Sequence, residues 1–322
     1  MTKHFLSCDW GTSSFRIRLA DARDGKVLAE ETSGQGIAQT FDLWQQTGGP
    51  AEERTSFYLG VIRNHIRKLE EQTARSLNDV KVIVSGMASS SIGMIEVPYA
   101  AVPLPLDGSG LKTESITADE TFEHDVLIIS GVRTANDVMR GEETQLIGCI
   151  EDGGKIKNEL YIFPGTHSKH ITIKDNLVTD IKTYMTGELF ALLSEKSILK
   201  NAVEPGGEFG ADSFLKGVKQ ARTENLLHHI FTVRTNQLFD ICDKTENYAY
   251  LSGSLIGAEL NALVDCDANI IHLVSSGNLA RYYQAALKEL LPAGKINIFS
   301  DNLADRAPVM GQIKIGGQLN IL

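Results

Sequence analysis

The chain has 322 residues, of which 42% are hydrophobic and 22% are charged, so it has the composition of an ordinary globular protein with room for two domains. Its net charge of −10 argues against a nucleic-acid-binding or anionic-membrane surface. The four cysteines are scattered without CxxC spacing, and neither a signal-peptide nor a membrane-spanning pattern is present. These features predict reduced thiols in a cytoplasmic protein.

The first stretch with distinctive chemistry covers residues 5–19, which read as a buried strand, a tight polar turn and a second strand. Asp9 ends the first apolar run, and Gly11, Thr12 and Ser13 form the turn. Successive backbone N–H groups in such a turn can bind an anion, and Mg²⁺ prefers one or two carboxylates together with phosphate oxygens. The stretch therefore fits a Mg²⁺-nucleotide site, although a plain β-hairpin explains the same residues.

The rest of the first half predicts a sheet with helices. A third antiparallel strand is expected at 26–31, and apolar spacing of helical period predicts a helix over 57–75. Buried parallel strands are expected at 80–84 and 126–130, alternating with helices, and the last helix is expected at 142–150.

The pattern begins again after a charged break at 151–158. Strands are expected at 160–163, 170–173 and 178–182, followed by helices at 186–199, 209–221 and 226–242. Strands at 248–251, 270–274 and 296–299 then alternate with helices at 254–263 and 279–291, and an amphipathic segment at 303–315 ends the pattern. The repeated topology predicts two similar α/β lobes with a ligand-binding cleft between them.

Two Gly-containing motifs in the second half suggest nucleotide contacts. The turn at 163–169 repeats the chemistry of the first turn, with Lys169 as a positive partner for phosphate. The stretch 250–259 reads as strand, Gly turn and helix, which would place Ser252–Ser254 at a helix N-terminus, and residues 275–278 repeat that device. Plain hairpin geometry and helix capping are the structural alternatives.

Two loops of the first half suggest chemistry on an acceptor. Residues 136–145 carry several carboxylates, one of which could take a proton from a hydroxyl, although acidic residues also cap helices. The Ser-rich loop 85–93 follows a parallel strand, where ligand loops gather, although a flexible connector would look the same.

In this order, the strings DWGTSSFR, SGMASSSIG, DVMRGEETQLIG, FPGTHSK, TGELFALL and LSGSLIGAEL resemble the 2-dehydro-3-deoxygalactonokinase family, within the superfamily of actin-like, hexokinase-like and Hsp70-like ATPases. The resemblance covers nearly the whole chain. It implies two ribonuclease H-like lobes with a cleft between them: an N-terminal lobe at 1–155, joined by the C-terminal segment 300–322, and a C-terminal lobe at 156–299.

The resemblance implies an ATP- and Mg²⁺-dependent kinase of carbohydrate metabolism, acting in galactonate catabolism on the primary 6-hydroxyl of 2-dehydro-3-deoxy-galactonate or a related 2-keto-3-deoxy aldonate. Asp9 would organise Mg²⁺, and the base would be Asp137 or Glu142, between which spacing does not decide. The other implied contacts form three sets. Phosphate would lie at Gly11, Thr12, Ser13, Gly165, Thr166, His167, Ser168 and Lys169, adenosine at Ser252, Gly253, Ser254, Gly257 and Gly277, and the sugar acid at Arg16, Met87, Ala88, Ser89, Arg140 and Glu188.

The chain departs from the residues usual in the family at Ser14, Ser91 and Met94, and has His170 where Trp often stands. The first three changes lie on the expected acceptor side, so they bear on which sugar acid is used. A phosphatase or nucleotide hydrolase, and a non-catalytic ATP-dependent sensor, are the alternative functions. A small-molecule substrate is expected rather than nucleic acid or membrane, and the oligomeric state stays open.

Overall fold

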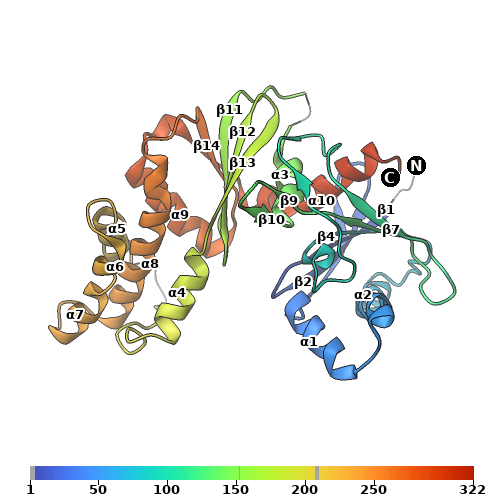
Figure 1. Ribbon diagram of the computed structural model, residues 1–322, viewed down its shortest axis with the longest axis horizontal. Coiled ribbons are helices and arrows are strands. Elements are labelled where there is room, and N and C mark those ends of the chain that lie inside the picture. The colour runs from blue at the N-terminus through green and yellow to red at the C-terminus, as the bar shows by residue number, and fades with distance from the viewer. Residues whose placement is uncertain (1–3, 152, 207–209) are drawn as a thin grey trace. The chain divides into compact units, whose positions relative to one another are not determined.

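The computed structural model describes residues 4–151, 153–206 and 210–322 (Figure 1). Contacts divide the chain into two compact units. Unit 1 comprises the chain up to Lys155, Asn176–Ile181 and Leu303–Leu322, and unit 2 comprises Ile156–Asp175 and Lys182–Asn302. The C-terminal helix, red in Figure 1, thus belongs to the same unit as the blue N-terminal strands.

Unit 1 is built on a six-stranded sheet in the order β3-β2-β1-β4-β8-β7. Its strands are β1 (His4–Trp10), β2 (Phe15–Asp21), β3 (Val27–Ser33), β4 (Val82–Gly86), β7 (Thr113–Ile116) and β8 (Val126–Ile129). The first three are antiparallel neighbours, whereas β4 and β8 run parallel to β1. This confirms the predicted strands, and it adds β7, whose four residues are mostly polar and half-exposed.

Alternation along the strands gives this sheet two apolar faces. Leu6, Cys8 and Trp10 of β1 pack with Tyr58 and Ile62 of helix α2 on one face. The opposite face packs against helices α3 and α10. The helices are α1 (Ile37–Thr47), α2 (Arg54–Thr73), α3 (Glu142–Cys149) and α10 (Asp301–Gln318).

The connection between β4 and β8 differs from the expected alternation of strands and helices. Its described residues contain no α-helix, only the 3₁₀ helix Met87–Ser89 and short strands. The short strands of this region and of the next connection are β5 (Ala100–Ala101), β6 (Leu104–Pro105), β9 (Val132–Arg133) and β10 (Val138–Met139). The prolines at 98, 103 and 105 explain why no helix forms there.

Unit 2 carries a second mixed sheet, in the order β15-β14-β11-β12-β13-β6. Its strands are β11 (Asn158–Phe163), β12 (Ser168–Lys174), β13 (Leu177–Tyr184), β14 (Ile270–Leu273) and β15 (Ile296–Ile298). Strand β11 is antiparallel to β12 and parallel to β14, as β1 is to β2 and β4. The first part of β13 belongs to unit 1, as does its partner β6.

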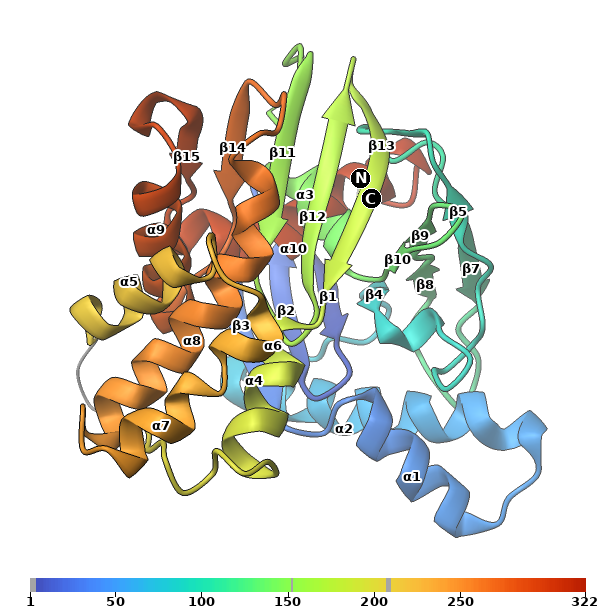
Figure 2. The ribbon, with the colours of Figure 1, turned by 60° about the vertical axis from the view of Figure 1, so that its left-hand side comes forward.

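The helices of unit 2 pack mainly on one face of this sheet, where α5, α8 and α9 cover β11 and β14 (Figure 2). They are α4 (Thr186–Glu195), α5 (Ala211–Gln220), α6 (Leu226–His229), α7 (Thr232–Leu238), α8 (Lys244–Leu260) and α9 (Gly277–Leu290). Short 3₁₀ helices lie at Ala51–Glu53, Asn261–Leu263 and Ala293–Lys295.

Two predictions for this region were wrong. The stretch expected as a strand at 248–251 lies inside α8, where Asp243 forms a capping box with Glu246 and starts the helix well before Tyr248. The helix expected over 226–242 is two short helices, α6 and α7. Phe209, where the sequence places the start of another helix, lies outside the described residues.

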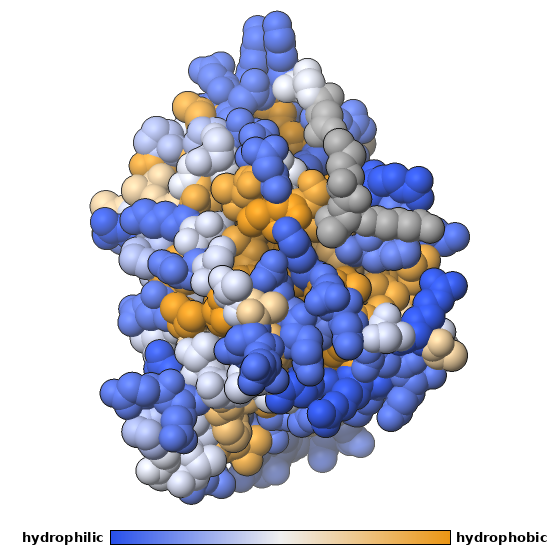
Figure 3. Space-filling view, turned by 90° about the vertical axis from the view of Figure 1, so that its right-hand side faces the viewer, coloured by the Kyte–Doolittle hydropathy of each residue, from blue (hydrophilic) through white to orange (hydrophobic). Residues whose placement is uncertain are grey.

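Hydrophilic residues dominate the rim of the face shown in Figure 3, and hydrophobic residues show between them near its centre. Among the described residues, no helix combines the length and the apolar character needed to cross a membrane.

Candidate active site

The first polar turn is a closed hairpin turn between β1 and β2. The Gly11 N–H donates to the Ser14 carbonyl over 2.9 Å, and the carbonyls of Gly11 and Thr12 accept from the N–H groups of Ile37 and Ala38 at the start of α1. Gly36 allows this close approach, since a Cβ there would lie 2.3 Å from the Thr12 oxygen. Thr12 and Ser13 are exposed, so their hydroxyls are available to a ligand.

Asp9 stands half-buried at the end of β1, opposite Arg16 of β2 and Ser85 of β4. Burial raises the pKa of this carboxyl, and the nearby guanidinium groups of Arg16 and Arg18 oppose that rise. Gln312 of α10 fixes the strand ends beside it, since its amide donates to the Cys8 carbonyl (3.0 Å) and to Ser85 Oγ (2.9 Å).

The start of α3 is brought against the same strand ends by two glycines with positive φ. Gly86 has φ +91°, and a Cβ there would lie 2.6 Å from the Trp10 carbonyl oxygen. Gly141 has φ +110°, and its Cβ would lie 3.3 Å from Gly86 Cα. Both positions favour glycine because of backbone conformation and space. The carboxyl ends of β1 and β4 and the N-terminus of α3 therefore meet.

Glu143 at this helix start is 1% exposed, and both of its carboxylate oxygens accept from the Gly141 N–H, at 2.9 and 2.7 Å. Burial, and secondarily the charge of Glu142, raise the pKa of Glu143 to about 7. A carboxyl group with a pKa in this range can exchange a proton near neutral pH, which an ordinary glutamate does not.

The two carboxylates singled out from the sequence occupy different settings. Asp137 lies in the turn between β9 and β10, where its Oδ1 accepts from the Val138 N–H over 2.7 Å. Glu142 is half-buried, and its Oε2 accepts from the Arg140 N–H over 2.9 Å. Both carboxylates thus contribute to local backbone structure.

The structure brings Arg140 and Ser89 together, two of the residues expected near the sugar acid. Arg140 Nη1 donates to the Ser89 carbonyl and to Ser89 Oγ, each at a distance of 2.5 Å. Its guanidinium lies 4.1 Å from the Tyr99 ring centre. Met87 is half-buried next to them, whereas Ala88 is fully buried in the core, so its side chain offers no exposed surface.

Arg16 is already paired. Its Nη1 lies 2.8 Å from Asp305 Oδ1 of α10. The neighbouring Arg18, whose side chain is 3% exposed, pairs with the same carboxylate and with Glu30. An anionic substrate at Arg16 would compete with Asp305.

The second turn packs against the start of α4. The Glu188 N–H donates to the Thr166 carbonyl over 3.0 Å, and His167 Nε2 lies 2.6 Å from Glu188 Oε2. A Cβ on Gly187 would lie 2.6 Å from the Gly165 oxygen. Thr166 and His167 are exposed, whereas Lys169 is buried and donates to Thr183 Oγ1 over 2.8 Å.

Behind this turn, the buried carboxylate of Glu259 accepts four hydrogen bonds. Ser168 Oγ and His170 Nε2 lie 2.7 and 2.9 Å from Oε1, and Thr186 Oγ1 and the Tyr283 hydroxyl donate to Oε2. Burial alone would raise the pKa of Glu259, but the hydrogen bond and charge of His170, with the hydroxyl donors, hold it below its usual value. Glu259 thereby joins β12, α4, α8 and α9.

A cavity of about 340 Å³ lies next to these residues within unit 2. The second turn and the start of α4 supply Gly165, Thr186 and Gly187, and polar groups come from Ser252 and Asn278. The aromatic rings of Phe190, Tyr248, Tyr282 and Tyr283 also line it, together with Pro205, Gly206, Leu255, Ile256 and Leu279. Its size and its mixture of rings and a few polar groups are typical of a small-molecule site.

The expected adenosine residues are only partly at this cavity. Ser252 lines it, and Gly277, with φ +65°, starts α9 one residue before Asn278. Ser252–Ser254 lie inside α8 rather than at a helix N-terminus, so that part of the argument was wrong. Gly253 and Gly257 pack against α5, where a Cβ would lie 2.0 Å from the Phe214 oxygen and 2.7 Å from Val218 Cα, and Ser254 is buried.

Sequence reasoning missed several of the residues just described. Glu143, Glu259 and Asn278 each lie in a motif that the sequence singled out, but nothing in the spacing shows which carboxylate is buried. Thr186 and Gly187 lie in the string TGELFALL. Tyr248 and Tyr282 carry no signal along the chain, because helices bring them together from distant positions.

The sheet orders define the class of protein. Each sheet contains three antiparallel strands followed along the chain by two parallel strands, and the five strands lie side by side in the order 3-2-1-4-5. In unit 1 this order is β3-β2-β1-β4-β8, and in unit 2 it is β13-β12-β11-β14-β15. This is the ribonuclease H-like topology, and a chain with two such sheets has the fold of the actin-like ATPases and hexokinase-type sugar kinases.

Comparison with known proteins narrows the class. The sequence pattern of the 2-keto-3-deoxy-galactonokinase family matches residues 9–300, and the chain belongs to this family. It is 32% identical to a protein of Rhizobium meliloti named as a probable 2-dehydro-3-deoxygalactonokinase, over 88% of this chain and 89% of the relative. It is 29% identical to the 2-dehydro-3-deoxygalactonokinase of Escherichia coli, over 90% of this chain and 91% of the relative.

A crystal structure from Sinorhizobium meliloti, described as that of a putative 2-dehydro-3-deoxygalactonokinase, superposes with a TM-score of 0.78. The two chains are 29% identical, and the matched region covers 96% of this chain and 95% of the other. The protein is therefore a kinase of this family, which confirms the family and the fold class expected from the sequence. Membership of a kinase family implies ATP as the cosubstrate.

Proposed function

We propose that this kinase transfers the γ-phosphoryl group of ATP to the primary 6-hydroxyl of 2-dehydro-3-deoxy-galactonate or a closely related 2-keto-3-deoxy aldonate. The names of the relatives support the substrate class. The observation that carries the chemistry is the meeting of the β1 end, with Asp9, the β4 end and the start of α3, with Glu143. We further propose that units 1 and 2 correspond to the two domains expected from the sequence.

Mg²⁺ fits Asp9, because this ion takes one or two carboxylates and completes its shell with phosphate oxygens and water. The described residues contain no cluster of three or more side chains suited to hold a metal alone, so the nucleotide would have to supply ligands. When bound, Mg²⁺ would neutralise phosphate charge. Thr12 and Ser13 would then contact phosphate oxygens from the first turn.

The cavity of unit 2 fits adenosine, with the rings of Tyr248 and Tyr282 beside a base and the amide of Asn278 as a polar contact. Gly165 joins this cavity to the second turn, so phosphates can continue toward Thr166 and His167. The buried Glu259 holds Thr186 and Tyr283 of the cavity wall in place.

For the acceptor, we place the base at the start of α3, with Glu143 as the first candidate and Glu142 and Asp137 as the candidates derived from the sequence. The raised pKa of Glu143 suits proton transfer near neutral pH. Arg140 is the better partner for the substrate carboxylate, because Ser89 and Tyr99 hold its guanidinium in place while Arg16 is paired with Asp305.

The test is a coupled assay of ADP release against a panel of 2-keto-3-deoxy aldonates and neutral sugars. Strong stimulation by one sugar acid is expected, and Asp9→Ala should remove nearly all of it. ADP release that no acceptor stimulates would instead support a nucleotide hydrolase. Nucleotide binding without any ADP release would support a sensor.

A further inference from the structure

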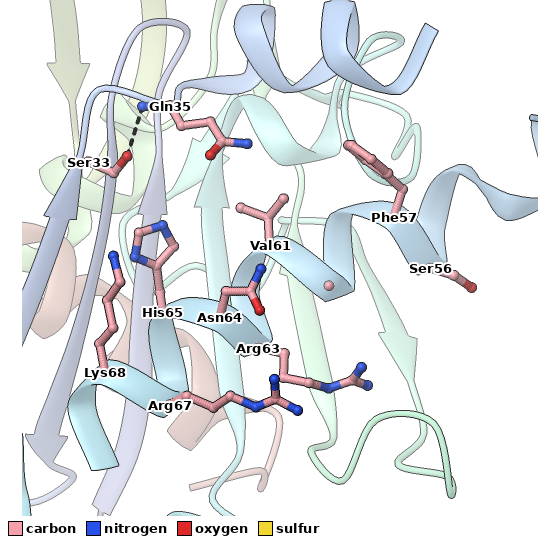
Figure 4. Close-up of a pocket in the computed structure, with 11 residues that line it drawn as sticks. Ser33, Gln35, Ser56, Phe57, Val61, Arg63, Asn64, His65, Arg67 and Lys68 are labelled. Atoms are coloured by element: carbon pink, nitrogen blue, oxygen red, sulfur yellow. Dashed lines mark hydrogen bonds between the residues drawn. The ribbon is translucent and has the colours of Figure 1, made fainter. Parts of the chain in front are cut away.

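A groove of about 710 Å³ lies within unit 1, along helix α2 and beneath the segment that follows β3 (Figure 4). None of its lining residues takes part in the function proposed above. The groove combines an unusual local charge, a buried polar atom without a partner and a direct connection to the first hairpin.

The charge comes from Arg63, Arg67 and Lys68 of α2, and no acidic side chain stands among the described residues that line the groove. This is a local excess of positive charge in a chain whose net charge is −10. Arg63 and Arg67 lie one helical turn apart and extend in the same direction in Figure 4. Arg63 also lies 5.4 Å from the ring centre of Phe122. Hydrogen bonds within its own turn, and then the charge of Arg63, lower the pKa of Asp119, so the charge of Arg63 is already partly compensated. Like charges at this spacing destabilise a helix, and an anion bound between them would reduce the remaining cost.

His65 lines the same groove and is 6% exposed. Its Nδ1 is buried and has no hydrogen-bond partner among the described residues, and its ring stacks on Phe15 with centroids 4.4 Å apart. Burial, and then the charge of Lys68, lower the pKa of His65, while Glu31 opposes the shift. The Glu31 carboxylate itself accepts a hydrogen bond from Gln72. A buried polar atom without a partner costs free energy, which a ligand can recover.

The far wall of the groove is tied to the first polar turn. Ser33 pairs in register with Phe15, the first residue of β2, and its Oγ accepts from the Gln35 N–H over 3.0 Å. The Gln35 carbonyl accepts from Trp10 Nε1 over 3.1 Å, and Gly36 packs on the carbonyl of Thr12. A ligand that contacts Ser33 or Gln35 would therefore perturb the residues on both sides of that turn, Trp10 and Phe15.

We propose that this groove binds a small anion, a metabolite bearing phosphate or carboxylate groups, through Arg63, Arg67, Lys68 and His65, and that its binding is sensed at the first hairpin through Ser33 and Gln35. Arginine side chains suit both anions because their N–H groups match pairs of oxygens. The proposal does not rest on the kinase function, since its test measures binding.

The chain has two tryptophans, so the variant Trp44→Phe leaves Trp10 as the only indole reporter. Its fluorescence would be followed during titration with inorganic phosphate or with citrate, at ionic strength held constant with sodium chloride. Excess Mg²⁺ and a non-hydrolysable ATP analogue would occupy the proposed nucleotide site throughout. We expect a saturable change, with phosphate or citrate binding more tightly according to the group recognised.

The double variant Arg63→Gln/Arg67→Gln should weaken this binding by about tenfold or more. The control Lys26→Gln/Arg75→Gln removes the same charge at exposed positions of unit 1 outside the groove, and should change it by less than about twofold. Thermal unfolding in chloride checks that each variant folds, and Lys68→Gln replaces the double variant if that one does not. No saturable response to either anion, or equal weakening in the groove and control variants, would overturn the proposal.

Discussion

At the scale of single residues, Glu143 is a carboxyl group whose pKa is set mainly by its burial. Because it is almost completely shielded from water and lies beside the charge of Glu142, its pKa rises to about 7, although the hydrogen bonds from the Gly141 N–H oppose that rise. If Glu143 is the base, kcat/KM should rise with pH through this value in the wild-type protein. Glu143→Gln should lower kcat by about 10²–10⁴-fold while ATP still binds.

Glu142→Gln and Asp137→Asn are the matched controls, since each removes one carboxylate of the same loop region. Loss of turnover in only one of these two variants would assign the base to that residue instead.

The pH dependence of stability gives an independent check on Glu143. A raised pKa means that wild-type stability falls as pH rises from about 4.5 to about 7, by on the order of 3 kcal/mol. Glu143→Gln should therefore be the more stable protein at pH 8, with the difference vanishing near pH 4.

Glu259 is the second residue whose buried charge can be tested. Glu259→Ala would leave Ser168, His170, Thr186 and Tyr283 without their common acceptor, so we expect a loss of about 3–5 kcal/mol in denaturant unfolding. Glu259→Gln should lose less and raise the KM for ATP, because Thr186 and Tyr283 line the cavity.

The sign of the pH effect follows from the lowered pKa of Glu259. Its ionised form stabilises the fold above the ordinary glutamate pKa, and this contribution is lost as pH falls through the lowered value. The gap between wild type and Glu259→Gln should therefore narrow in acid. Glu159→Gln is the control, since Glu159 pairs with His272 over 2.8 Å at a less buried site outside the cavity lining. An equal rise in KM for that variant would contradict the positioning role of Glu259.

At the scale of elements, the crossing of α5 and α8 depends on missing side chains. A Cβ on Gly253 would lie 2.0 Å from the Phe214 oxygen, which is too short for any contact. Gly253→Ala should therefore force the helices apart and destabilise the protein by about 1–3 kcal/mol or more. Thermal unfolding measures this directly.

Gly60 in the middle of α2 is the matched control, because a Cβ there would meet nothing within 4 Å. Gly60→Ala should stabilise by about 0.5–1 kcal/mol through helix propensity. Destabilisation of similar size in both variants would show that the tight crossing is not the cause.

At the scale of the whole molecule, the C-terminal helix completes a unit that begins more than 280 residues earlier in the chain. Asp305 of α10 pairs with Arg16 and Arg18 of β2, and the Arg18 side chain is almost fully buried. Asp305→Ala should cost on the order of 2 kcal/mol, less than a fully buried pair, because Asp305 is half-exposed and Glu30 remains beside Arg18.

Chemical denaturation tests this, with Arg23→Ala as the control. Arg23 pairs with Asp21 but its side chain is 75% exposed, so its loss should destabilise the protein clearly less than the loss of Asp305. If the two variants lose the same stability, the link between β2 and α10 adds nothing beyond a surface ion pair.

The sequence by itself determined the parts of this protein that depend on local pattern. Alternating and continuous apolar runs predicted most strands of both sheets, and helical periodicity predicted α2 and α9, because side-chain burial follows those periods directly. The mostly polar β7 and the two-residue β6 carry no such run and were missed. The ordered motifs, from DWGTSSFR to LSGSLIGAEL, were enough to identify the family.

Only the tertiary structure decided which of those residues face a ligand and which face the core. Ser254 and Gly253 looked like ligand contacts, but a capping box at Asp243 extends α8 through them, and α5 packs over them. Burial raised the pKa of Glu143, and four donors from other elements converged on Glu259. These properties arise from segments far apart in the chain meeting in space, so no local pattern contains them.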